Sequence, residues 1–183
     1  GSAFSSTSLT GTVQLPEGLK YVSGFEGTKI TNVQFPSTLE EIGSVAFKSC
    51  SALMCEITLP ASLKRIDTQA FWQTGIKGNL VLPENLELIG ASAFYQCRNL
   101  TGSLIIPSGI KVIYSQQSVG TFSGCGFNGN LTLPMGLTEI QSSAFSGTKF
   151  KGELNIPSTV NTIGNYAFSN NEFNGTLVLP KEL

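Results

Sequence analysis

The chain has 183 residues, with 11 lysines and arginines against 12 acidic residues, a net charge of −1 and no histidine. Without a basic run it does not suit the neutralisation of nucleic-acid phosphates, and no apolar stretch approaches the roughly 18 residues that span a bilayer. Without histidine it also lacks the Ser-His and Cys-His pairs that activate nucleophiles, so catalysis is disfavoured.

A single repeating unit runs through the whole chain. All eight prolines occupy one position of this unit, at successive spacings of 20, 24, 23, 24, 27, 23 and 23 residues. They are Pro16, Pro36, Pro60, Pro83, Pro107, Pro134, Pro157 and Pro180. Proline at a near-constant period marks a structural unit that has been copied. The uninterrupted register predicts one domain over residues 1–183, with about seven complete repeats and a partial repeat at each end.

In chain order, each unit begins with a strand that leads into its proline. Apolar residues alternate there, as at Ile76, Gly78, Leu80 and Leu82, and a period of two is typical of a half-buried strand. Because proline has no N–H for the ladder and a fixed φ, we expect each strand to end at or just before it. The intervening polar residues should face solvent.

The second part of each unit follows the proline. Apolar residues recur three and six positions after it, which suits an arc more than a strand or a full helix. A phenylalanine then follows, in a segment too short for an α-helix that we expect to form a single helical turn. The phenylalanine column should be nearly fully buried; it comprises Phe47, Phe71, Phe94, Phe122, Phe145 and Phe168.

One unit has too few apolar residues to form a core alone. Stacking the units turns each column of like residues into a continuous internal ladder. The sequence therefore predicts a solenoid with a period of about 23 residues, a parallel sheet of short strands, and a length of about 35 Å at the usual strand spacing.

The consensus Leu-x-x-(Leu/Ile/Val)-x-(Leu/Ile)-Pro-x-x-(Leu/Val)-x-x-Ile-Gly-x-x-Ala-Phe-x-x-Cys resembles the BspA-type leucine-rich repeat. The residues that match its glycine and cysteine are Gly43, Gly90, Gly164, Cys50, Cys97 and Cys125. Departures are Asp67, Tyr114 and Gln141 at the glycine and Thr74, Thr148 and Asn171 at the cysteine. The resemblance covers essentially the whole chain. It implies a right-handed leucine-rich-repeat solenoid on a bacterial cell-surface or secreted protein, in a family whose members are thought to act as adhesins or host-interaction modules.

The four cysteines do not indicate a metal site or a disulfide framework. Cys50, Cys97 and Cys125 share one column, Cys55 takes an inward strand position, and none forms a Cys-x-x-Cys pair. In-register side chains point in parallel, whereas a disulfide requires them to converge. We expect four free, mostly buried thiols, and the sequence gives no indication of a metal or a cofactor.

Three departures from the plain repeat supply candidate binding residues. Trp72 and Tyr95 each follow the ladder phenylalanine in adjacent copies, so they should form a solvent-facing aromatic pair, useful for binding or merely shielding the solenoid. Four extra residues after Tyr114 should form a loop, which is either a binding element or tolerated drift. Val81 and Ile105 are apolar in an exposed, mostly polar column and could form a small sticky patch.

These observations favour a non-catalytic binding or adhesion module that recognises a host or bacterial surface protein, or a glycan, through its extended face. The alternative is a rigid spacer that displays other domains, and a carbohydrate-active enzyme is less favoured. Ends led by Phe4 and Leu9 and by Leu177, Leu179 and Leu183 do not look like polar caps. We therefore expect a fragment of a longer array, or association of the chain end to end.

Overall fold

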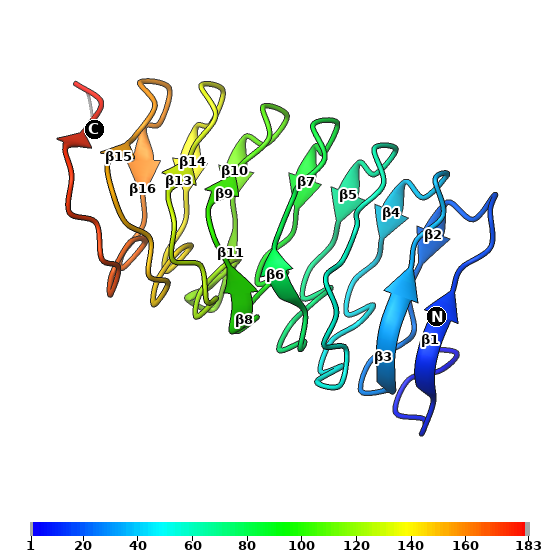
Figure 1. Ribbon diagram of the computed structural model, residues 1–183. Helices are drawn as coiled ribbons and strands as arrows, with labels where there is room; N and C mark the ends of the chain where they lie inside the picture. The colour runs from blue at the N-terminus through cyan, green and yellow to red at the C-terminus, as the bar shows by residue number, and fades with distance from the viewer. Residues whose placement is uncertain (1, 182–183) are drawn as a thin grey trace.

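The computed structural model describes residues 2–181. Their backbone winds into a right-handed parallel β-solenoid of about seven turns, with neighbouring repeats side by side and the two termini at opposite ends of the array (Figure 1). Within residues 2–181 the regular elements are all strands, and no helix forms. The predicted solenoid with a repeat of about 23 residues is confirmed.

Strands on the first face of the solenoid precede the prolines, and we call this the pre-proline face. They pair in parallel as four two-stranded sheets, β1–β3, β6–β8, β9–β13 and β15–β17. Their bounds are β1 Thr10–Gln14, β3 Lys29–Gln34, β6 Lys77–Asn79, β8 Asn99–Thr101, β9 Leu104–Ile105, β13 Leu131–Thr132, β15 Leu154–Asn155 and β17 Leu177–Val178. Six strands end two residues before a proline, as predicted. The exceptions are Pro60, which no strand among the described residues precedes, and Pro83, where β6 ends four residues earlier.

Strands on the second face follow the prolines, and we call this the post-proline face. Their bounds are β2 Tyr21–Val22, β4 Glu41–Ile42, β5 Arg65–Ile66, β7 Leu88–Ile89, β10 Val112–Ile113, β14 Glu139–Ile140 and β16 Thr162–Ile163. They form parallel sheets in the orders β2–β4–β5–β7 and β10–β14–β16. The prediction of an arc here is wrong, because within each sheet the isoleucine or valine of a repeat and the residue before it pair with their equivalents in the next repeat.

A tight corner carries the phenylalanine, and the prediction of a helical turn there is also wrong. The N–H groups of Val45, Phe47 and Ser49 donate to carbonyls of the next repeat at 2.7–3.0 Å, while those between them bond within the corner. Alternate residues must therefore face opposite ways. Val45 and Ser49 accordingly have φ values of 54° and 60°, which a right-handed helical turn does not allow.

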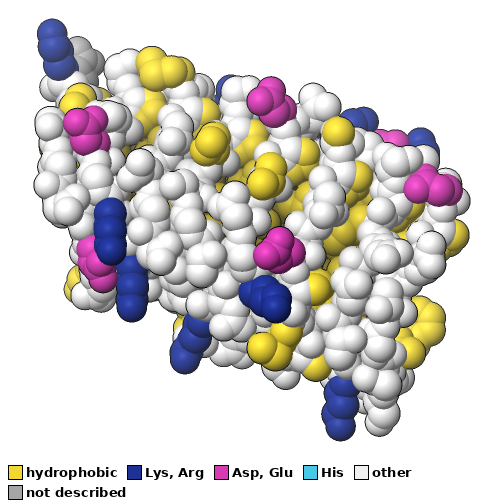
Figure 2. Space-filling model, in the orientation of Figure 1, with side chains coloured by type: hydrophobic (Ala, Val, Ile, Leu, Met, Phe, Trp, Pro, Cys, Tyr) yellow, Lys and Arg dark blue, Asp and Glu magenta, His cyan; other side chains and the backbone are white. Residues whose placement is uncertain are grey.

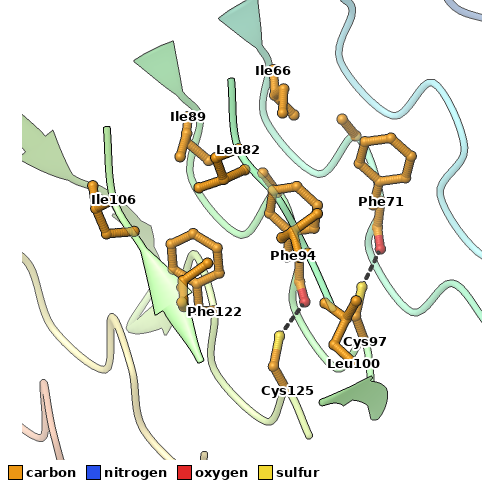
Figure 3. Close-up of a cluster of buried hydrophobic side chains, with 14 of the residues drawn as sticks. Ile66, Phe71, Leu82, Ile89, Phe94, Cys97, Leu100, Ile106, Phe122 and Cys125 are labelled. Atoms are coloured by element: carbon orange, nitrogen blue, oxygen red, sulfur yellow. Dashed lines mark hydrogen bonds between the residues drawn. The ribbon is translucent and has the colours of Figure 1, made fainter. Parts of the chain in front are cut away.

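The phenylalanine column forms a stack along the inside of the solenoid (Figure 3). Phe94 lies between Phe71 and Phe122, with ring centroids 5.3 and 5.5 Å away and planes within 10° of parallel. Phe47, Phe71, Phe94, Phe122 and Phe145 are fully buried, which confirms the prediction for five of the six. Phe168 is only half-buried, because the described residues supply a stacking phenylalanine on one side alone.

Candidate functional site

Two adjacent repeats present aliphatic side chains on the pre-proline face, where the equivalent residues of five other repeats are polar. Val81 and Ile105 lie two residues before their prolines and are 67% and 66% exposed. Figure 2 shows apolar side chains gathered in an interrupted band across one face, among polar atoms and scattered charges. The structure thus brings these two predicted residues together at the surface, on neighbouring repeats.

The boundary between these two repeats is paired through β6 and β8, but the part nearest the prolines has no ladder hydrogen bonds, and we call this part the seam (residues 80–89 against 103–114). On the pre-proline face, Leu104 and Ile106 donate to the following repeat at 2.9 and 3.0 Å. The equivalent N–H groups of Leu80 and Leu82 have no backbone acceptor among the described residues. The first half of the seam is therefore unpaired.

The post-proline half of the seam is unpaired too, since β7 and β10 lie in different sheets. The N–H of Gly90 donates to the preceding repeat at 2.7 Å, but the equivalent N–H of Tyr114 finds no backbone acceptor in residues 2–181. Like the other repeat boundaries in that range, this one keeps pairing on at least one face, here through β6 and β8. The seam is therefore a local gap in the ladder, between the β6–β8 pairing and the bond from the Phe94 N–H to the Thr121 carbonyl.

Two shallow depressions meet at the seam, each of about 420 Å³. The depression on the pre-proline side is lined by Val81 and Ile105 together with buried leucine and isoleucine side chains. The depression on the post-proline side is lined mainly by polar and charged residues, including Glu87 and Lys64. Glu84 and Ser108 line both depressions, so the seam joins an apolar hollow to an acidic one across the proline corner.

The carboxylates of the post-proline depression differ in their partners. Glu40 lies between Lys20 and Lys64, with N–O distances of 3.0 and 3.1 Å, and their hydrogen bonds, that of Lys20 first, lower its pKa. Glu84 and Glu87 are exposed and make no ion pair with any described residue. Sequence reasoning missed both residues. The alternation of charge at Lys20, Glu40, Lys64, Glu87 and Lys111, each four residues after a proline, was a signal that could have drawn attention to Glu87.

Comparison with known proteins identifies the family. The family model described as "BspA type Leucine rich repeat region" matches six copies, over residues 1–119 and 103–183. The chain belongs to the BspA-type leucine-rich repeat family. No curated protein matches it.

Solved leucine-rich repeat structures share the fold of this BspA-type chain. The T. pallidum leucine-rich repeat protein TpLRR is 23% identical with a TM-score of 0.61, over 91% of this chain and 72% of that one. A leucine-rich repeat protein from Bacteroides ovatus ATCC 8483 is 19% identical with a TM-score of 0.57, over 92% of this chain and 52% of that one. The chain thus spans about half the length of the B. ovatus protein. At these identities the likeness shows the fold alone.

Trp72 and Tyr95 lie together on the corner of two adjacent BspA-type repeats. Their ring centroids are 4.2 Å apart with planes tilted by 42°, so the predicted pair exists, although both side chains are half-buried. Lys48 lies 6.0 Å from the Trp72 ring centroid, and the Tyr95 hydroxyl accepts a hydrogen bond from Gln96 at 2.9 Å. Because the rings cover part of each other and the neighbouring polar groups are engaged, the pair shields the corner as well as presenting an aromatic surface.

The four extra residues of the BspA-type repeat after Pro107 form a β-hairpin rather than an irregular loop. Antiparallel strands β11 (Ser115–Gln116) and β12 (Val119–Gly120) are joined by two residues with left-handed φ values of 49° and 64°. The hairpin contacts earlier repeats, because Gln69 donates to Gln116 at 3.3 Å and Ser92 to the Val119 carbonyl at 2.8 Å. Tyr114 lies at the base of this hairpin, at the edge of the seam. Its side chain is half-buried.

The cysteine column of the BspA-type repeats is structural. The thiols of Cys97 and Cys125 donate to the carbonyls of Phe71 and Phe94 at 3.0 and 2.9 Å (Figure 3). Thr74, which replaces cysteine in its own repeat, instead donates to the Phe71 carbonyl three residues before it at 3.1 Å, so threonine bonds within its repeat where cysteine bonds to the preceding one. All four thiols are free, three of them buried and Cys55 half-buried.

In the described residues, no three histidine, cysteine or acidic side chains come together as metal ligands would. The same residues contain no helix long and apolar enough to cross a membrane.

Proposed function

We propose that this chain is a non-catalytic binding module that docks a protein partner on its pre-proline face, at the seam. The observation that carries the proposal is the pair of aliphatic side chains on adjacent repeats, each about two-thirds exposed above a hollow. Exposed apolar residues grouped over a depression and rimmed by polar groups are typical of protein interaction sites. Leucine-rich repeat proteins commonly bind proteins, which supports the same choice.

Attachment to a bacterial cell surface, or secretion, is part of this proposal. It is supported by membership of the BspA-type family, which is bacterial and associated with surface proteins. In that setting the partner is a host or bacterial surface protein, and the activity is adhesion. Association of the chain with itself, through exposed apolar residues at its ends such as Phe4 and Leu177, is a separate proposal that sedimentation at increasing concentration tests.

Two other functions remain as alternatives with observations of their own. Glycan binding is favoured by the aromatic pair at Trp72 and Tyr95, since aromatic rings with polar tips stack on sugars. A rigid spacer is favoured by the continuous phenylalanine stack, because a spacer needs a rigid core and no exposed binding site. Identifying the residues that contact a partner distinguishes these functions.

The experiment is a binding screen of the purified chain against matrix proteins and glycans, run with matched variants. We expect a protein to be captured, and the Val81→Ser/Ile105→Ser chain to bind it more than tenfold more weakly. The control is Met54→Ser, which removes a comparably exposed apolar side chain outside the seam. If the seam variants leave capture unchanged but Trp72→Ala abolishes it, the binding site lies at the aromatic pair and the proposal is wrong. If the chain binds none of the proteins or glycans, the spacer function is favoured.

A further inference from the structure

We propose that the seam selects a partner segment in which an aliphatic residue lies close in sequence to an arginine or lysine. This inference rests on the proposed function, since it names the chemistry of the protein that docks there. The aliphatic side chain enters the hollow beside Val81 and Ile105, and the basic side chain lies against Glu84 and Glu87.

The apolar half of the proposal follows from what surrounds the two aliphatic residues. The floor of the pre-proline depression is formed by Leu82 and Ile106, which are buried core residues. A side chain that covers Val81 and Ile105 removes their exposed surface from water, and burial of apolar surface is the main gain in association. The hollow of about 420 Å³ is too small for a secondary-structure element and suits one or two side chains.

The basic half follows from the charges that line both hollows. Glu40, Glu84 and Glu87 stand against the single lysine Lys64, which gives a lining charge of −2. Lys64 is already engaged with Glu40, whose other side contacts Lys20. Glu84 and Glu87 are therefore the two carboxylates at the seam that lack a counter-ion among the described residues.

The spacing of the two partner residues follows from the geometry of the seam. Glu84 and Ser108 line both depressions, so a segment leaving the apolar hollow reaches the unpaired carboxylates by crossing the proline corner. An extended segment advances about 3.3–3.6 Å per residue, and an arginine or lysine side chain adds its own length. One or two residues between the aliphatic and the basic side chain are therefore enough.

The seam can accept a segment because its two sides approach closely without ladder bonds between them. A Cβ on Gly109 would lie 2.5 Å from the Leu86 carbonyl oxygen, so the proline corner itself is in contact. Residues 80–89 make no backbone hydrogen bond to residues 103–114, so docking there breaks none. A docked segment therefore competes with water rather than with the solenoid's own pairing.

The test titrates short peptides into the isotope-labelled chain, whose mass of 19.4 kDa suits two-dimensional NMR. One peptide holds isoleucine and arginine two residues apart in a glycine-serine background, a second replaces the arginine with glutamate, and a third replaces the isoleucine with serine. We expect the first peptide to shift the amides of Val81, Glu84, Ile105 and Ser108, and the other two to bind at least fivefold more weakly. Raising the salt to 1 M should weaken the first peptide, because the Debye length falls to about 3 Å.

Variants of the chain provide the controls. Glu84→Gln/Glu87→Gln should weaken the isoleucine–arginine peptide about fivefold, a modest loss because exposed ion pairs contribute little each. A matched control is Glu172→Gln, which removes an exposed carboxylate elsewhere. Equal binding of the arginine and glutamate peptides, shifts confined to Trp72 and Tyr95, or a response to neutral oligosaccharides alone would overturn the inference. A protein captured in the screen that needs Val81 and Ile105 but not Glu84 and Glu87 would overturn the inference and leave the proposed function standing.

Discussion

Replacing Phe94 with alanine tests whether the phenylalanine stack holds the solenoid together. The side chain is fully buried, and both faces of its ring are covered, by Phe71 at 5.3 Å and Phe122 at 5.5 Å. A buried Phe→Ala substitution costs about 3–5 kcal/mol, and each aromatic stack adds about 0.5–1.5 kcal/mol beyond burial. We therefore expect Phe94→Ala to reduce the free energy of unfolding by about 5 kcal/mol, at the upper end of the range.

The control is Phe168→Ala, in the same column. Its ring is half-buried and stacks in parallel on Phe145 alone, so burial accounts for about 2 kcal/mol. Urea denaturation followed by circular dichroism gives the comparison, and the midpoint is the safer measure because solenoids need not unfold in one step. A midpoint for Phe94→Ala close to that of the unmodified chain, or equal losses in the two variants, would refute the reasoning.

Other predictions concern the seam, the thiols and the hairpin. The Leu82 amide should exchange with deuterium faster than that of Ile106, and equal protection would contradict the unpaired seam. Cys97→Val should cost no more than about 1 kcal/mol, because the Phe71 carbonyl keeps its bond from the Thr74 hydroxyl at 3.1 Å when the thiol is removed; a larger loss of stability would contradict this. Burial raises the pKa of Cys125 well above its ordinary value, so its contribution to stability should be lost as the pH rises above about 8.5, where the unfolded thiol ionises first; a Cys125→Thr chain with the same alkaline slope would refute this. Deleting residues 115–118 restores the 23-residue spacing and should shift the melting temperature by only a few degrees, and a collapse of the fold would show that the hairpin is structural.

The columns of the solenoid could be predicted because each is a strict periodic pattern. Phe94 recurs at a fixed distance from its proline, and a ring that recurs at that spacing stacks on its equivalents wherever the backbone runs. Polar residues such as Glu56 and Thr132 are exposed for the same reason, since alternation places them opposite the core. Periodicity therefore fixed which side chains lie inside, without any knowledge of the corner geometry.

The corner geometry could not be predicted because its cause lies in the neighbouring repeat. Val45, Gln69 and Tyr166 adopt left-handed φ values although none is glycine or asparagine. Bonds to the next repeat, such as Val45 N–H to the Thr68 carbonyl at 3.0 Å, offset the strain of this conformation. Local propensity alone predicts a helical turn, but the hydrogen bonds to the neighbouring repeat override it.

The seam lies beyond sequence reasoning for a further reason. The spacing of 24 residues from Pro83 to Pro107 equals that from Pro36 to Pro60. The sequence register therefore shows no break at the place where β7 and β10 do not pair. Sequence did mark Val81 and Ile105, because each is apolar in a polar column. What the structure adds is that the two residues line a hollow beside a local gap in the ladder, between residues 80–89 and 103–114, that carries two carboxylates without a counter-ion among the described residues. Drift at a single position does not by itself explain why these features lie together, whereas the docking site that we propose would.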